Sequence, residues 1–198
     1  MALYKQTKYN EAARQFELAF REAATCNVTI RPIYVIQELL SNIALCYTKI
    51  NLPDSSLYYY EAAISYIDKH SKDFGEPYMA KKAKGVIYGN MAGIYFNKHY
   101  YDVAEALMKM SISINVQPRY ENADAQKTKI KLARLYFEKN DTISMFQTLM
   151  DLRRSMDTLH DESVEQNWRE MMYLYFFSGT QNYNLKGYGS YVRAVRAF

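Results

Sequence analysis

The stretch Asn42-Ile-Ala-Leu-Cys-Tyr47 decides the fold, because its pattern returns as Asn90-Met-Ala-Gly-Ile-Tyr95. Both read Asn, an apolar residue, Ala, two further residues and Tyr. Lys131-Leu-Ala-Arg-Leu-Tyr136 keeps the part from the apolar residue onward, and Met171-Met-Tyr-Leu-Tyr175 keeps the apolar residue and the Tyr. Residues three and four apart share one face of an α-helix, so the pattern predicts helices that each present these side chains on one face.

The tyrosines that end these copies, here called the anchor tyrosines, are followed by residues at fixed distances. Nine residues on stands a small or medium side chain: Ser56, Ala104, Met145 and Asn184. A large one comes four residues later: Tyr60, Met108, Leu149 and Tyr188. Three residues further on are Ala63, Ser111, Leu152 and Tyr191. This spacing predicts a second helix whose small residue lets the two backbones approach. Such hairpins must stack, because a lone hairpin leaves its apolar face exposed.

An incomplete copy precedes these four, with Leu3 at the anchor position and Ala12, Phe16 and Ala19 in the second helix. Helix breaks are expected near residues 27–31, 51–53, 71–76, 115–119 and 159–162, which predicts nine helices and part of a first one. The whole chain holds only 7 Gly and 4 Pro. A β-sandwich of this size would need more turn residues, so the composition favours long helices.

Acidic residues mark several expected helix starts. Asp54 and Asp141 are predicted to cap second helices, and Asp161 would place negative charge at the start of another. Within the repeat, Ala104 is expected in a tight helix seam. Ala125 is expected outside the motif, where a larger side chain would cost less stability.

The pattern resembles the tetratricopeptide repeat (TPR), whose hallmark is small and aromatic residues at these offsets. Trp168 stands seven residues before Tyr175, where the family often has a Trp, and Gly179 falls at the usual turn. The resemblance implies an all-α solenoid of stacked antiparallel helical hairpins, wound as a right-handed superhelix. It also implies a single array over residues 1–198, with a partial repeat at 1–31 and repeats at about 32–76, 77–119, 120–160 and 161–198.

Successive anchors are 44, 48, 41 and 39 residues apart, longer than the TPR norm of about 34. This long-repeat form resembles the TPR regions of bacterial regulators and of TPR-containing sensor histidine kinases. Both ends of the chain look cut, which predicts a segment of a larger protein or a protein with a very short N-terminal copy. Exposed terminal hairpins would then favour homo-oligomers.

Several functional classes are not expected. The net charge of +4 comes from basic residues scattered among acidic ones, which argues against nucleic-acid binding. The longest apolar run, Met171–Phe177, is too short for a membrane span. His70, His99 and His160 lie far apart, which disfavours a helical metal site. We therefore expect no catalytic residue, cofactor or metal ligand, and no enzyme activity in this chain.

First helices of TPR hairpins line a concave groove, and offsets from the anchors predict which residues face it. These residues are Asn90, Phe96, Lys127, Lys131, Arg134, Phe137, Arg169, Tyr173 and Phe176. The groove is predicted to be aromatic with a basic middle. Asn90, Lys127 and Lys131 match positions at which chaperone-binding TPR domains clamp a carboxylate, but Ser41 and Leu45 break the other two. A clamp of that type is not expected, and an ordinary solvated face is the alternative to a binding groove.

The sequence thus predicts a non-catalytic scaffold that binds a protein or peptide, one with acidic side chains, on its concave face. One alternative is a sensory or coupling region of a larger bacterial signalling protein, either a histidine kinase or a transcription regulator. A second alternative is a self-association module. The compartment is expected to be cytoplasmic, or periplasmic if the chain is the sensory part of a membrane-bound kinase.

Overall fold

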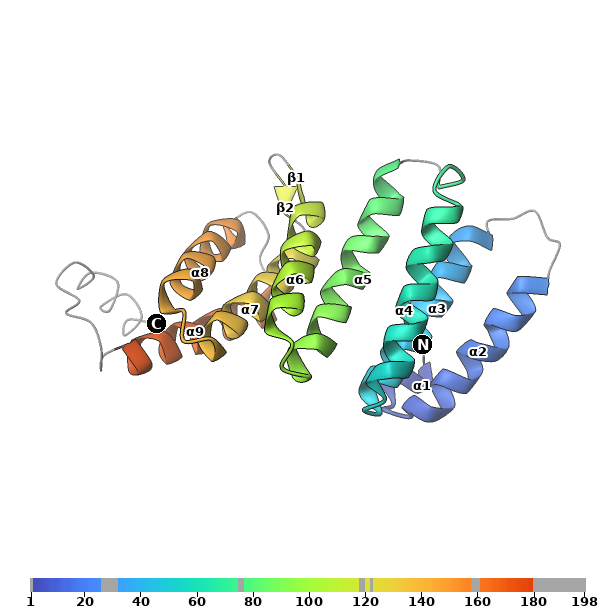
Figure 1. The fold of residues 1–198 in the computed structure, drawn as a ribbon, viewed down its shortest axis with the longest axis horizontal. Coiled ribbons are helices and arrows are strands. Elements are labelled where there is room, and N and C mark those ends of the chain that lie inside the picture. The colour runs from blue at the N-terminus through green and yellow to red at the C-terminus, as the bar shows by residue number, and fades with distance from the viewer. Residues whose placement is uncertain are drawn as a thin grey trace. The chain divides into compact units, whose positions relative to one another are not determined.

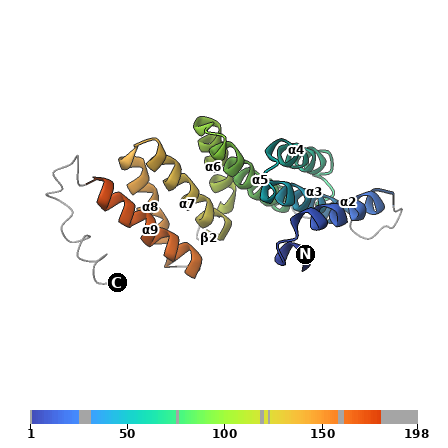
Figure 2. The same ribbon diagram turned by 90° about the horizontal axis from the view of Figure 1, so that it is seen from below.

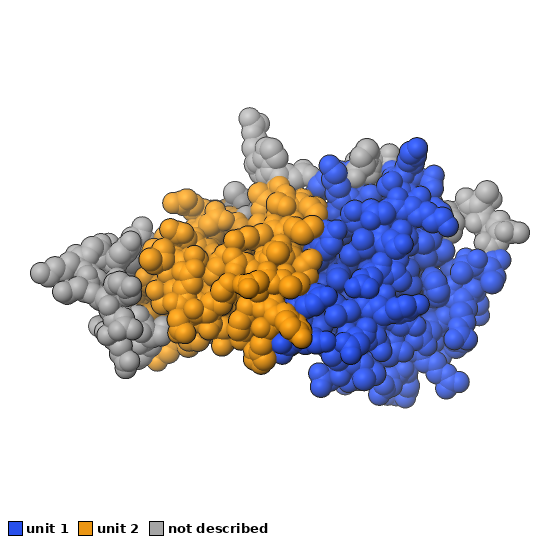
Figure 3. Space-filling model, in the orientation of Figure 1, with its two compact units in different colours: residues 1–98 blue, residues 99–198 orange. Residues whose placement is uncertain are grey.

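The computed structural model describes residues 2–25, 32–74, 77–117, 120–121, 123–157 and 161–179. The chain divides into two compact units, residues 1–98 and residues 99–198 (Figure 3). Each unit is treated on its own below.

Unit 1 is built from helices alone in its described part. In chain order these are α1 (Ala2–Lys5), α2 (Tyr9–Thr25), α3 (Pro32–Lys49), α4 (Pro53–Lys69) and α5 (Pro77–Asn97). Consecutive helices pack against each other from α1 to α5. Helices α3 and α5, each the first helix of its hairpin, also touch (Figure 1). The short α1 is the predicted remnant of a first helix.

Unit 2 holds four helices and one pair of very short strands in its described part. These are α6 (Tyr101–Asn115), β1 (Val116–Gln117), β2 (Tyr120–Glu121), α7 (Ala123–Glu138), α8 (Thr142–Met156) and α9 (Glu162–Gly179). The strands pair antiparallel between α6 and α7, where the sequence indicated only a break. The predicted all-α stack of antiparallel hairpins is confirmed. The ninth predicted helix falls after residue 179, outside the described residues.

The hairpin register predicted from the anchors is confirmed by burial. Ser56, Tyr60 and Ala63 of α4 are all fully buried. The Ser56 hydroxyl donates to the Ala44 carbonyl oxygen at 2.7 Å, which requires the backbones of α3 and α4 to lie close together. In unit 2, the longer side chain of Met145 is also fully buried at the small-residue position.

Two sequence predictions about individual residues are wrong. Asp54 does not cap α4, because the helix begins one residue earlier at Pro53, whose fixed φ suits a first helical position. Asp54 forms an ion pair with Lys98 instead, at 2.9 Å. Ala125 does not lie outside the core: it is as fully buried as Ala104. The reason is that α7 packs against three helices, α6, α8 and α9, so few of its faces reach solvent.

Two caps on unit 2 helices match the sequence. The Asp141 carboxylate accepts a hydrogen bond from the Ser144 amide at 3.0 Å and caps α8 as predicted. At the start of α9, the Asp161 carboxylate accepts from the amides of Ser163 and Val164 at 2.9 and 3.2 Å. These bonds satisfy amides that have no partner inside the helix.

Each of the four hairpin turns that the structure describes contains one residue with positive φ, four residues after the anchor position. The angles are 60° at Thr7, 58° at Asn51, 61° at His99 and 57° at Asn140. At the second of these turns, the Leu52 amide donates to the Tyr47 carbonyl at 2.9 Å and the Asn51 amide donates to the Thr48 carbonyl at 3.2 Å. This is the Schellman arrangement that closes helix ends. Asn and His tolerate the left-handed region better than most residues, so their recurrence was a turn signal that the sequence analysis missed.

We predict that Asn51→Gly leaves the free energy of unfolding unchanged or raises it by up to about 1 kcal/mol, because Gly adopts positive φ without strain. Asn51→Val should lower it by about 1–2 kcal/mol, because a β-branched residue is strained there. Urea unfolding of both variants measures this. Asn97→Val, at an exposed helical position, is the control and should shift stability less. Equal losses for both valine variants would contradict the role of the turn.

Candidate functional site

Three of the anchor tyrosines, Tyr47, Tyr136 and Tyr175, contact the second helix of the preceding hairpin. The Tyr47 hydroxyl donates to Glu17 Oε1 of α2 at 2.8 Å. The Tyr136 hydroxyl donates to Glu105 Oε1 of α6 at 3.1 Å. The ring of Tyr175 stacks on Phe146 of α8 with centroids 4.9 Å apart. The anchors therefore fix the orientation of the first helices, whose opposite faces form the candidate binding surface.

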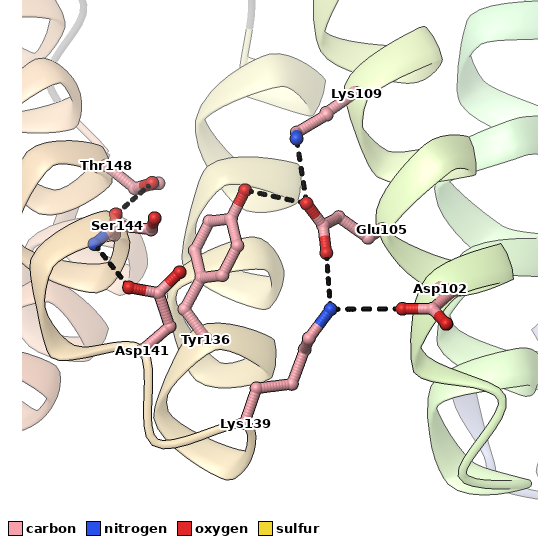
Figure 4. Close-up of polar contacts among 8 residues, drawn as sticks. All are labelled: Asp102, Glu105, Lys109, Tyr136, Lys139, Asp141, Ser144 and Thr148. Atoms are coloured by element: carbon pink, nitrogen blue, oxygen red, sulfur yellow. Dashed lines mark hydrogen bonds and ion pairs between the residues drawn. The ribbon is translucent and has the colours of Figure 1, made fainter.

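The contact at Glu105 is part of a charged cluster between α6 and the end of α7 (Figure 4). Besides Tyr136, Glu105 accepts hydrogen bonds from Lys109 at 2.7 Å and from Lys139 at 2.9 Å. Lys139 also binds Asp102 at 3.1 Å. The two lysines hold the pKa of Glu105 down to about 2, and Glu105, followed by Asp102, raises the pKa of Lys139 to about 12. The cluster therefore stays charged across the physiological pH range.

In unit 1 a pair of tyrosines, Tyr47 and Tyr59, joins α3 and α4 to α2 through Glu17. The rings of Tyr47 and Tyr59 stack with centroids 5.5 Å apart and an interplanar angle of 8°. Both hydroxyls donate to the same oxygen of Glu17, at 2.8 and 3.1 Å. Burial, followed by the bond to Glu17, raises the pKa of Tyr59 to about 12. Tyr59 belongs to the run of three tyrosines in α4, of which Tyr60 is fully buried and Tyr58 is 67% exposed.

Seven of the nine predicted groove residues lie on two neighbouring helices of unit 2. Helix α7 carries Lys127, Lys131, Arg134 and Phe137, and α9 carries Arg169, Tyr173 and Phe176. The two helices pack side by side (Figure 2). On α7 the four residues follow one another at helical spacing, so they share a face. We call these seven residues the α7/α9 face.

The α7/α9 face combines exposed cations with aromatic rings. Lys127, Arg134, Arg169 and Tyr173 are exposed, while Lys131, Phe137 and Phe176 are partly buried. Tyr173 is 54% exposed, so its side chain is accessible from solvent.

Carboxylates missed by the sequence analysis make this face less basic than predicted. Asp161 lies 3.7 Å from Lys127, and Glu165 lies 2.7 Å from Arg169. The first pair joins α7 to the start of α9, because Asp161 is also the cap of α9. Both acids were visible in the sequence, but only the packing of α9 on α7 brings Asp161 to Lys127.

The other two predicted groove residues, Asn90 and Phe96, lie on α5 of unit 1, and both are partly buried. The buried hydroxyl of Tyr60 makes no hydrogen bond within the described part of the chain. Burial raises the pKa of Tyr60 and outweighs the nearby polar side chains of Thr48 and Asn90, which act to lower it. The structure thus assigns the nine residues to two separate units.

Helix α5 also carries three glycines at a spacing of four residues, Gly85, Gly89 and Gly93. A Cβ atom added at Gly93 would meet no other atom within 4 Å. The corresponding residues, two before each anchor, are Leu45, Arg134 and Tyr173. The α5 surface is therefore open where the other first helices carry large side chains.

The described residues contain no group of three His, Cys, Asp or Glu side chains placed to hold a metal ion. None of the described helices has the length and hydropathy needed to cross a membrane.

No family model matches this sequence, and no curated protein matches it either. Solved structures do resemble it. BtubC (BKLC) from P. vanneervenii matches with a TM-score of 0.73 at 15% identity, covering 98% of this chain and 76% of its own. A kinesin light chain-like protein from Podosopora anserina with nearly identical TPR-like repeats matches with a TM-score of 0.66 at 13% identity, covering 99% and 90%. The fold is TPR-like. At these identities the likeness concerns the fold alone.

We predict that Gly93→Ala raises the free energy of unfolding by about 0.5–1 kcal/mol, because Ala is a better helix former and its methyl group enters open space. Thermal or urea unfolding measures the change. A loss of stability would contradict the open surface at this position.

We predict that Glu105→Gln lowers the free energy of unfolding at neutral pH by about 1–2 kcal/mol, allowing for solvent screening of the partly exposed cluster. The folded-state pKa of Glu105 lies near 2, below its ordinary value of 4.5. Its contribution is therefore complete above about pH 4.5 and is lost as the pH falls toward 2. Urea unfolding over this range should show parent and variant converging at acid pH.

The matched control is Glu138→Gln, which removes an exposed carboxylate from the end of α7. It should change stability by less than about 0.5 kcal/mol at any pH. If both variants lose the same stability with the same pH dependence, the Glu105 cluster does not hold α6 and α7 together.

Proposed function

We propose that this chain is a non-catalytic protein-interaction module that binds a peptide segment on the α7/α9 face. The observation that carries the proposal is the exposure of Arg134 and Tyr173 on two helices that pack side by side. A TPR-like fold supports a scaffold role, because stacked hairpins present a rigid surface that loses little entropy on binding.

The chemistry of the face favours a peptide that alternates acidic and apolar side chains. Aromatic rings such as Phe137 and Tyr173 offer flat apolar contact, and aromatic side chains often dominate binding energy. Arg134 offers a planar guanidinium that can bind a carboxylate through two hydrogen bonds. An acidic ligand would compete with Asp161 for Lys127 and with Glu165 for Arg169. Exposed pairs of this kind contribute little stability, so exchanging their partners costs little.

Three other predictions from the sequence are independent of binding at the α7/α9 face. They are a role as the sensory or coupling region of a bacterial signalling protein, self-association through terminal hairpins, and a single array over residues 1–198. Each stays a prediction.

Binding can be tested with a fluorescein-labelled synthetic peptide that alternates Glu with Leu and Phe, followed by fluorescence anisotropy. A counterpart with Lys in place of Glu should bind more weakly. Arg134→Glu should weaken binding of the acidic peptide by about tenfold at low salt and by less at high salt, because salt screens exposed charges. Phe137→Ala should weaken binding similarly at both salt concentrations, because the lost contact is apolar.

The control is Arg154→Glu, which reverses an exposed charge on α8 rather than on the α7/α9 face. It should leave the anisotropy curve close to that of the parent. The proposal is overturned if the acidic peptide binds Arg134→Glu and Phe137→Ala as well as it binds the parent. It is also overturned if Arg154→Glu weakens binding by as much as Arg134→Glu does.

A further inference from the structure

A concave region of unit 2 lies on the side of α7 away from the α7/α9 face. It is a groove of about 570 Å³ between the two second helices α6 and α8, with α7 at its base. Ile112 and Leu132 contribute apolar side chains, and Lys109, Lys129 and Asp151 contribute charged ones. Figure 4 shows Lys109 and Thr148, two of the lining residues, on opposite sides of α7. The volume lies in the range of small-molecule sites, about 300–1,000 Å³.

The groove coincides with a departure from the repeat. Seven residues before the anchor, the copies have Leu40, Tyr88, Lys129 and Trp168. Trp168 shows what a large side chain does at this position: its Nε1 donates to the Leu149 carbonyl of α8 at 2.8 Å, and its ring packs on a buried cluster that includes Ile130 and Leu152. In α7 the same position holds Lys129, whose thin aliphatic stem fills far less space than an indole. The lysine therefore accounts for the hollow between α6 and α8.

Lys129 is also unusual because its charged side chain is buried. The residue is only 5% exposed, and its ammonium forms an ion pair with Asp151. Removing a charge from water costs free energy that an ion pair often fails to recover, so a well-packed apolar pair would often serve the fold at least as well. The Asp151 side chain is 60% exposed, so its carboxylate can turn out to water. The lysine and its partner thus resemble a binding site more than a structural bridge.

We propose that this groove binds a small amphipathic carboxylate, with its anionic head on Lys129 and its apolar body against Ile112 and Leu132. The ligand carboxylate would replace Asp151 on the ammonium, and Asp151 would move into solvent. Lys109 adds a second positive charge to the lining, although Glu105 binds it at 2.7 Å. Together Lys109, Lys129 and Asp151 give the lining a net positive charge, which complements an anionic head in a mainly apolar hollow.

Decanoate is the probe, and 1-decanol, which has the same chain without the charge, is its matched control. Isothermal titration calorimetry of the 198-residue chain should show saturable binding of decanoate to one site, with decanol binding at least about tenfold more weakly. Amide chemical-shift changes in a ¹⁵N-labelled sample should map to α6, α7 and α8 at the groove. They should leave Arg134 and Tyr173 of the α7/α9 face unaffected.

Two substitutions at one residue separate charge from space. Lys129→Met keeps an unbranched side chain that is one atom shorter and removes the ammonium, and should weaken decanoate binding by about tenfold or more while leaving decanol binding unchanged. Lys129→Trp copies the next repeat, fills the groove and should abolish binding of both probes. Arg154→Met, an exposed cation on α8, is the control and should bind decanoate like the parent.

Thermal unfolding shows that each variant is folded before it is titrated. Lys129→Met is expected to fold, because the Asp151 side chain is 60% exposed and its carboxylate stays solvated once the ammonium is removed. The proposal is overturned if decanoate does not bind the parent. It is also overturned if Lys129→Met binds decanoate as tightly as the parent, or if decanol binds as tightly as decanoate.

Discussion

The structure depends on one constraint: the apolar face of a helical hairpin can be buried only by the next hairpin. The anchor residues meet this constraint across hairpins rather than within them. Tyr136 reaches Glu105 on the preceding second helix, and Tyr175 stacks on Phe146 in the corresponding place. A tyrosine suits this position because its ring stays in the seam while its hydroxyl reaches a carboxylate at the edge. Once the anchor is fixed, the remaining face of each first helix is left for other contacts.

The two candidate sites follow from the two sides of a single helix. Residues of α7 that are three or four apart share a face, so Lys127, Lys131 and Arg134 lie together while Lys129 points the opposite way. On one side the cations stand at the surface beside aromatic rings. On the other, a single ammonium is buried among apolar side chains. The first arrangement suits a peptide that lies along the surface, and the second suits a small molecule that enters a groove.

The fold could be predicted from the periodicity of the sequence, but contacts between neighbouring hairpins could not. Repetition at fixed offsets identified Ser56, Tyr60 and Leu149 as core residues, because these offsets lie on the helix faces that the stacking of hairpins must bury. The acidic partners of the anchors could not be found this way, since Glu17 follows its anchor position by 14 residues and Glu105 by 10. Ala125 was placed outside the repeat motif, yet it is fully buried on α7, a helix that packs against three others. For the candidate face, the sequence identified Arg134 and Tyr173, but the pairing of Lys127 with Asp161 required the fold. Their role in binding stays a prediction.

The left-handed turn residues have a consequence for how such a chain can change in length. In the first four copies the distance from anchor to turn residue is four, and the small residue follows five later. The first helices, by contrast, begin 15, 18, 13 and 13 residues before Tyr47, Tyr95, Tyr136 and Tyr175. The differences in length between the copies therefore lie outside the hairpin turn, where an added residue does not rotate the second helix out of its seam. On this basis a whole hairpin can be inserted, removed or replaced as one unit, with the junctions placed between hairpins.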